Sequence, residues 1–166
     1  MTWGNPPKFK STPSDNKKGK VITPEMLAAR GSEDGEQAAL FCWAADNVGK
    51  YPQLKWLFAI PNGGSRHIAE ATKMVATGLR GGVPDIFLPY PMQKRDYQGF
   101  AEKFSYGYHG CFIELKIEKR RYQKNGGCSQ EQLEWIIKLR ENYYIEVCYG
   151  WQNAKNTLIA YLEGRL

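Results

Sequence analysis

Two apolar segments that carry charged side chains constrain this chain more than any other feature. Residues 82–88 (GVPDIFL) and 111–116 (CFIELK) both have the composition of buried strands. Asp85 nevertheless opens the first strand, and Glu114 and Lys116 lie in the second. Because side chains along a strand alternate between its two faces, Glu114 and Lys116 are predicted to point to the same side. We therefore expect two carboxylates and a lysine to share one half-buried place.

Such a cluster costs free energy unless another group compensates for it. An unpaired buried carboxylate is strongly disfavoured, and two neighbouring carboxylates repel each other. A divalent cation would remove this cost, because Mg²⁺ takes one or two protein carboxylates together with waters and phosphate oxygens. A plainer interpretation stays open, in which Asp85 caps a turn after Pro84 and Glu114 pairs with Lys116 on a solvated sheet face.

Composition indicates a single globular domain with a flexible start. The chain has 166 residues, of which 42% are hydrophobic and 24% charged. Residues 1–31 are rich in Pro, Lys, Ser and Gly and are predicted to form a basic arm, with a short helical turn after Thr23 and Pro24. Residues 32–166 are predicted to form the domain.

The sequence has no sign of a membrane span, a signal peptide or a cysteine-based framework. No apolar run is long enough to cross a bilayer, so we expect a cytoplasmic protein, or one in the nucleoid or host cytoplasm if it is phage-encoded. The four cysteines include no C-x-x-C pair, which indicates neither a zinc site nor a disulfide framework.

The distribution of charge favours an anionic partner. The formal net charge is +6, with 23 Lys and Arg against 17 Asp and Glu. One basic run lies in the arm, and a second directly follows Lys116 and comprises Lys119, Arg120, Arg121 and Lys124. This second run is where a phosphate-facing rim would have to lie, although a solvated strand end would also explain it.

Apolar periodicity and turn residues predict alternating helices and strands. Helices are expected from Ser32, over residues 68–79, from Ser129 and over Trp151–Leu162, and strands over residues 54–60, 83–88, 111–117 and Tyr144–Tyr149. Ser129 and Gln132 fit a capping box. The order predicts an α/β protein with a mixed sheet covered by helices on both faces.

Residues 89–110 between the two charged strands have no clear period and many aromatic and basic side chains. We interpret them as a long hairpin connection or insertion. Their composition suits stacking on bases, contact with a second subunit, or ordinary packing, and the sequence does not choose between these.

Taken in order, these motifs resemble the PD-(D/E)xK nuclease superfamily and, within it, a stand-alone VRR-NUC (virus-type replication-repair nuclease) domain. The matching elements are Glu36 in the first helix, Pro61-Asn62-Gly63-Gly64 with Arg66, Gly82-Val83-Pro84-Asp85, Glu114-Leu115-Lys116, and Ser129 to Gln132 followed by Trp135. The resemblance implies a restriction-endonuclease-like fold, a mixed central sheet flanked by helices. The long segment 89–110 departs from the family pattern.

The resemblance also implies roles for individual residues. Asp85, Glu114 and the backbone carbonyl of Leu115 would hold Mg²⁺ or Mn²⁺, and Glu36 would complete the site directly or through water. Lys116 would position or deprotonate the attacking water, with its pKa lowered by a nearby cation and by burial, and Gln132 would orient the same water. Contacts to DNA would come from Asn62, Gly63, Gly64, Arg66, Lys119, Arg120 and Arg121.

The activity implied is that of a metal-dependent endodeoxyribonuclease that hydrolyses phosphodiester bonds. Stand-alone domains that resemble this one tend to be homodimers that cut branched DNA such as four-way (Holliday) junctions in repair or recombination, and a two-fold dimer suits a two-fold junction. Other functions stay open: a flap-type or non-selective DNA nuclease, an RNA nuclease, or a non-catalytic nucleic-acid-binding protein on the same fold.

Overall fold

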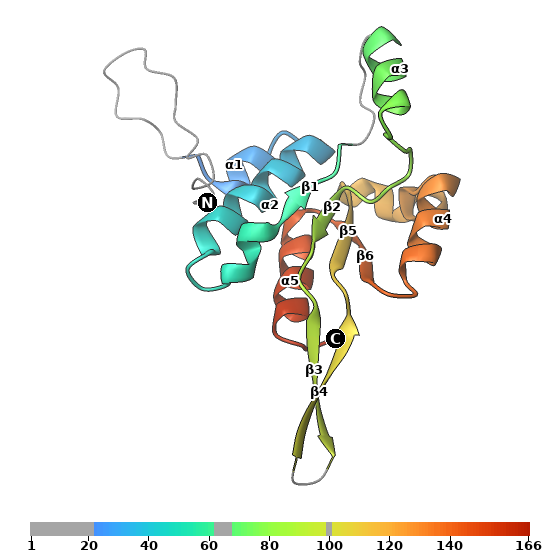
Figure 1. Cartoon of the computed structure of the whole chain (residues 1–166). Coiled ribbons are helices and arrows are strands. Elements are labelled where there is room, and N and C mark those ends of the chain that lie inside the picture. Colours follow the sequence, from blue (N-terminus) through green and yellow to red (C-terminus); the bar gives the residue numbers. More distant parts are fainter. Residues whose placement is uncertain (1–21, 62–67, 99–100) are drawn as a thin grey trace, which may run out of the picture.

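The fold is built on a four-stranded mixed sheet (Figure 1). The computed structural model describes residues 22–61, 68–98 and 101–166. The strands lie in the order β1 (Phe58–Ala59), β2 (Ile86–Leu88), β5 (Cys111–Lys116) and β6 (Tyr144–Tyr149). β2 is antiparallel to both β1 and β5, whereas β5 and β6 are parallel. The predicted mixed sheet is confirmed.

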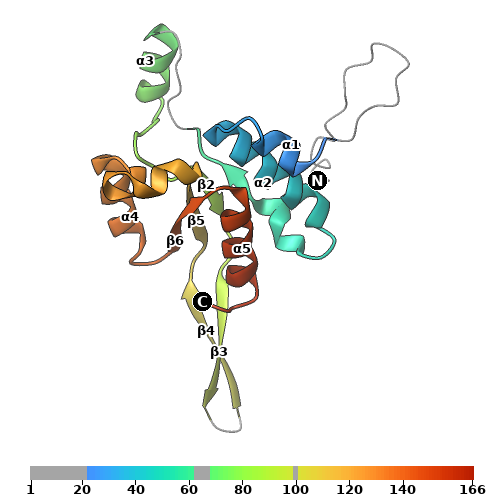
Figure 2. The same cartoon turned by 180° about the vertical axis from the view of Figure 1, so that it is seen from behind.

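Helices cover both faces of the sheet, as predicted (Figures 1 and 2). On one face, α2 (Glu33–Asn47) and α5 (Trp151–Leu162) bury a core that includes Leu40, Ile113 and Leu158. On the other face, α4 (Gln130–Leu139) packs against a smaller cluster that includes Phe112 and Ile136. The strands alternate between these two environments, so each face of the sheet is buried by its own helices.

Two elements extend away from this body (Figures 1 and 2). β3 (Met92–Gln98) and β4 (Ala101–Tyr108) form a long antiparallel hairpin, which confirms the hairpin predicted within residues 89–110. The helix α3 (Ile68–Ala76) projects from the opposite side. Among the helices of the described residues, none is both long and apolar enough to cross a membrane.

The N-terminal part of the described chain packs on the domain. α1 (Pro24–Ala28) begins after Thr23, whose hydroxyl accepts a hydrogen bond from the Met26 N–H, so the short helical turn predicted here is present. Leu27 and Ala28 pack against the main core. Residues 1–21, the rest of the predicted arm, lie outside the described residues.

Most predicted boundaries agree with the structure, but the strand over residues 54–60 is largely wrong. Residues Pro52–Trp56 form the 3₁₀ helix η1, and only Phe58 and Ala59 pair with β2. Pro52 provides the fixed φ that suits a first helical position. Leu54 and Leu57 are both buried, at the three-residue spacing of a 3₁₀ turn and not at the two-residue spacing of a strand.

Alternation along β5 places the charged side chains as the sequence predicted. Cys111, Ile113 and Leu115 belong to the core under α2 and α5, and Phe112 to the cluster under α4. Glu114 and Lys116 share the parity of Phe112 and therefore point to the α4 face. The charged pair thus lies between the sheet and α4.

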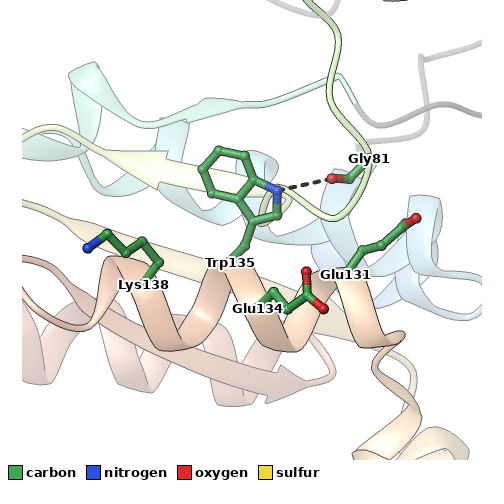
Figure 3. A pocket seen from close by; sticks show the side chains of 5 residues that line it. All are labelled: Gly81, Glu131, Glu134, Trp135 and Lys138. Atoms are coloured by element: carbon green, nitrogen blue, oxygen red, sulfur yellow. Dashed lines mark hydrogen bonds between the residues drawn. The ribbon is translucent and has the colours of Figure 1, made fainter.

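The helix α4 also fixes the segment that leads into β2. Gly82 has φ +79°, and a Cβ there would lie 2.7 Å from the Glu131 carbonyl carbon and 2.9 Å from the Gln132 nitrogen. Trp135 Nε1 donates to the Gly81 carbonyl over 3.1 Å, beside an open pocket of about 390 Å³ that also involves Glu131, Glu134 and Lys138 (Figure 3). These contacts position Asp85 relative to α4.

Replacing Gly82 with alanine is therefore expected to disturb the fold where it supports Asp85. The new Cβ would be strained at a left-handed φ and would overlap backbone atoms of α4, so Gly82→Ala should lower the free energy of unfolding by about 1–3 kcal/mol. Urea denaturation measures this loss. Gly81→Ala is the matched control, because its Cβ would meet only the mobile end of Glu131 at 3.3 Å. Equal losses in the two variants would contradict the prediction.

Candidate active site

Asp85 and Glu114 lie on adjacent strands at the same level. Ile86 pairs with Ile113 in the antiparallel register of β2 and β5, so Asp85, one residue earlier, is opposite Glu114. The Leu115 N–H donates to Asp85 Oδ2 over 2.8 Å, which fixes this carboxylate against β5. The structure therefore brings together the two carboxylates that the sequence singled out.

Glu114 is fully buried, and its two carboxylate oxygens have different surroundings. Its Oε1 accepts hydrogen bonds from Lys116 Nζ and from Gln132 Nε2, each over 2.5 Å. Its Oε2 is buried and receives no hydrogen bond from an N–H or hydroxyl donor among the described residues, and the Asp85 carboxyl is within hydrogen-bond reach of this side chain. Buried polar atoms are nearly always satisfied by protein, water or an ion, so an unsatisfied carboxylate oxygen indicates a place for a ligand.

Gln132 joins the capping box of α4 to this carboxylate. Its Oε1 accepts from the Ser129 N–H over 2.9 Å, and its backbone N–H donates to the Ser129 hydroxyl. The cap uses the carbonyl oxygen of the amide, so the Nε2 group faces Glu114. The predicted capping box is confirmed, and the side chain contacts Glu114 as well.

Burial dominates the electrostatics of the pair. Desolvation, and then the charge of Asp85, raise the pKa of Glu114 to about 8, although Lys116 opposes this shift. Desolvation lowers the pKa of Lys116, but the hydrogen bond and charge of Glu114, with smaller contributions from Glu33 and Asp85, outweigh it and raise the pKa overall. The groups around Lys116 thus raise its pKa, whereas the sequence led us to expect a lowered one.

The donor set fits a hard divalent cation. The described residues contain no cluster of three or more His, Cys, Asp and Glu side chains able to hold a metal. Mg²⁺, however, usually takes only one or two protein carboxylates and completes its shell with water and phosphate oxygens. Asp85 and the unsatisfied Oε2 of Glu114 are such a pair.

Glu36, the helix acid singled out from the sequence, contacts the start of α5. Its Oε2 accepts a hydrogen bond from the Trp151 N–H over 2.8 Å. Trp151 is the first residue of α5, and the Gly150 that precedes it offers no side-chain cap. Glu36 therefore satisfies an otherwise unpaired N–H and places a negative charge at the positive end of α5.

Glu33, one turn earlier in α2, is an acid whose charge acts on Lys116. Its charge contributes to the raised pKa of Lys116, and its Oε1 is buried without a hydrogen bond from any described residue. Arg120 Nε lies 3.8 Å from this oxygen. One sequence signal points to Glu33, its first-turn position after the Ser32 cap, but the same signal also fits Glu36.

The candidate DNA contacts fall into two groups. Asn62, Gly63, Gly64 and Arg66 lie outside the described residues. The other three belong to the 3₁₀ helix η2 (Glu118–Tyr122), directly after β5. Lys119 is exposed, Arg120 approaches Glu33, and Arg121 pairs with Glu118 and lies over the Tyr149 ring. A basic rim therefore borders the acidic site.

Comparison with known proteins identifies the family. Residues 32–152 match the VRR-NUC domain family. A solved structure described as a VRR_NUC domain protein is similar over 80% of this chain and 88% of its own, with 24% identity and a TM-score of 0.56, and shares the fold. No curated protein matches the chain. The family implies a nuclease-type function with DNA as substrate, and the chain belongs to the VRR-NUC domain family of nucleases.

Proposed function

We propose that this protein is a Mg²⁺- or Mn²⁺-dependent endodeoxyribonuclease whose active site is built on Asp85, Glu114 and Lys116. The observation that carries the proposal is the fully buried Glu114, with one oxygen held by Lys116 and Gln132 and the other unsatisfied beside Asp85. A buried charge cluster of this kind is costly for stability alone and is typical of functional sites.

In this proposal, Asp85, Glu114 and the Leu115 carbonyl hold the ion. A divalent ion, when bound, supplies positive charge that stabilises the phosphate as it is attacked and favours ionisation of water. Lys116 positions the attacking water beside Glu114, to which its ammonium group is bonded. Gln132 positions Glu114 itself, because its amide is fixed by the α4 cap and donates to that carboxylate.

We assign the helix acid of the site to Glu33 in place of Glu36. Glu33 has a buried oxygen without a hydrogen bond from the described residues and an electrostatic effect on Lys116, whereas Glu36 caps α5. Glu33 completes the site through water, since three carboxylates are not gathered closely enough for direct coordination. Arg120, which lies near Glu33, is then available to a phosphate once the ion neutralises the cluster.

We further propose that the substrate is branched DNA, such as a four-way junction, and that the active form is a homodimer. Support comes from the net charge of +6 and from a single domain with two projecting elements, α3 and the β3–β4 hairpin, that a second subunit or a second DNA arm can contact (Figure 1). Two symmetric sites suit a substrate with two-fold symmetry.

Removing the charge of Glu114 should abolish metal-dependent cleavage without harming the fold. Glu114→Gln is expected to reduce cleavage roughly 10²-fold or more and to weaken Mg²⁺ binding measured by calorimetry. Because glutamine has the size of Glu114 and keeps an oxygen that can accept from Lys116, the far-UV circular dichroism spectrum should be unchanged.

A matched surface change, Lys138→Ala on the exposed side of α4, should leave cleavage unaltered. EDTA should stop cleavage by the unmodified protein, and Mg²⁺ or Mn²⁺ should restore it. Full cleavage by Glu114→Gln would point to a non-catalytic nucleic-acid-binding protein.

Two of the three acids in the first turn of α2, Glu33 and Glu36, provide a direct comparison. Glu33→Gln should lower Mg²⁺-dependent cleavage while leaving the unfolding free energy nearly unchanged. Glu36→Gln should retain cleavage but lose about 0.3–1 kcal/mol of stability, because the charge at the start of α5 is removed. Cleavage rates and thermal unfolding of both variants decide the assignment. The reverse pattern would return the role to Glu36.

Substrate preference and assembly are tested together. Linear, flap and four-way-junction DNA, and RNA of the same sequence, are incubated with the protein and Mg²⁺ or Mn²⁺, and the molar mass is measured by light scattering. We expect the junction to be cut fastest and the mass to be that of a dimer. Equal cleavage rates on all DNAs would contradict the proposed preference for branched DNA but would still support a DNA nuclease.

A further inference from the structure

An exposed tyrosine lies in the basic loop that follows the candidate catalytic strand. The basic loop comprises η2 (Glu118–Tyr122) and η3 (Lys124–Gly127). Tyr122 is 84% exposed, the highest value among the large hydrophobic side chains of the described residues. An aromatic ring has a large apolar surface and a π-face, so an exposed ring can stack on another planar ring.

The backbone that carries Tyr122 is held in place. The Gln123 N–H donates to the Arg120 carbonyl over 3.0 Å, and the Gly126 N–H donates to the Gln123 carbonyl over 3.0 Å. The Tyr149 hydroxyl donates to the Gly126 carbonyl over 3.0 Å, which ties the loop to β6. The ring is therefore presented from a hydrogen-bonded segment and not from a loose end.

The surroundings of Tyr122 favour a nucleic acid over an apolar partner. Within residues 118–124 there are four basic side chains and one acidic one, Glu118. Both oxygens of Glu118 are bonded to Arg121, at 2.6 and 3.0 Å, and Arg121 also lies 4.3 Å from the Tyr149 ring centroid. Lys119, Arg120 and Lys124 belong to the same segment as Tyr122 and are exposed, and Arg120 also lies 3.8 Å from Glu33. Cations around an aromatic ring are typical of surfaces that bind phosphates and stack bases.

The basic loop also lies beside the acidic cluster. It begins two residues after Lys116, and Arg120 Nε is 3.8 Å from Glu33 Oε1. Burial raises the pKa of Tyr149, which anchors the loop, and the charge of Lys116 is one of the smaller contributions that lower it. The basic loop would therefore be next to a DNA strand that has a phosphate at the carboxylates.

We propose that Tyr122 stacks on a nucleobase of the DNA substrate next to the scissile phosphate, while the neighbouring cations hold the backbone. The inference rests on the proposed function and deepens it. Bases inside an intact duplex are covered by their neighbours, so a stacking ring favours sites where a base is unpaired or splayed, as at a branch point. Tyr122 thereby contributes to the choice of substrate and takes no part in the hydrolysis.

Binding in EDTA tests stacking separately from cleavage. The probe is a branched oligonucleotide with 2-aminopurine at the unpaired positions, and its anisotropy and fluorescence are followed as the full chain is added. Tyr122→Ala should weaken binding about 5- to 100-fold and abolish the quenching of 2-aminopurine, whereas Tyr122→Phe should retain both. The slope of log affinity against log salt should stay the same in Tyr122→Ala, whereas Lys119→Ala should make it shallower by about one.

Ile137→Ala is the matched control, because Ile137 is also a large exposed side chain, at 70%, but lies on α4. Affinity of Tyr122→Ala within twofold of that of Ile137→Ala would overturn the proposal. So would conversion of a dimer to a monomer by Tyr122→Ala, which would assign the ring to a protein contact.

The two proposals fail in different ways. If the protein quenches 2-aminopurine through Tyr122 but cuts no DNA with Mg²⁺ or Mn²⁺, the proposed function fails and stacking stands. If it cuts branched DNA at the same rate and affinity with and without Tyr122, stacking fails and the nuclease function stands.

Discussion

The buried carboxylate of Glu114 is the constraint on which the rest of the site depends. A buried carboxyl group needs hydrogen-bond donors, and two elements supply them: β5 through Lys116 and α4 through Gln132. Asp85, at the entry to β2, instead adds a second negative charge that raises the pKa of Glu114. One oxygen is satisfied by the two donors, and the other is not. The fold thus keeps one buried oxygen of Glu114 without a hydrogen-bond donor among the described residues. This arrangement is costly for stability, but it leaves that oxygen able to bind a cation.

The helix α4 has a larger role than covering the second face of the sheet. Its first turn meets the backbone of Gly82, its Trp135 binds the Gly81 carbonyl, and its capping glutamine holds Glu114. The same turn therefore positions both carboxylates. A capping interaction, which usually serves only the helix, here also sets the geometry of the candidate active site.

Features that depend on residues close together in the chain were predicted correctly more often than features that depend on packing. The bounds of β6 and α5 followed from apolar periodicity and the Gly150 turn, and the capping box from two residues three apart. The strand predicted over residues 54–60 failed because a short apolar run does not distinguish a strand from a 3₁₀ turn. Likewise, Glu33 and Glu36 are equivalent as first-turn acids, and only the packing of α2 against α5 separates them.

The sequence by itself determined the α/β class, the strand that carries Glu114 and Lys116 on one face, and the family, because alternation and ordered motifs are properties of the chain. Only the tertiary structure decided which acid of α2 caps α5, that Gln132 contacts Glu114, and that Tyr122 is presented to solvent from a fixed loop. The physical reason is that these features depend on residues far apart in the chain. A charge, an amide or a ring acquires its role from the neighbours that folding brings to it.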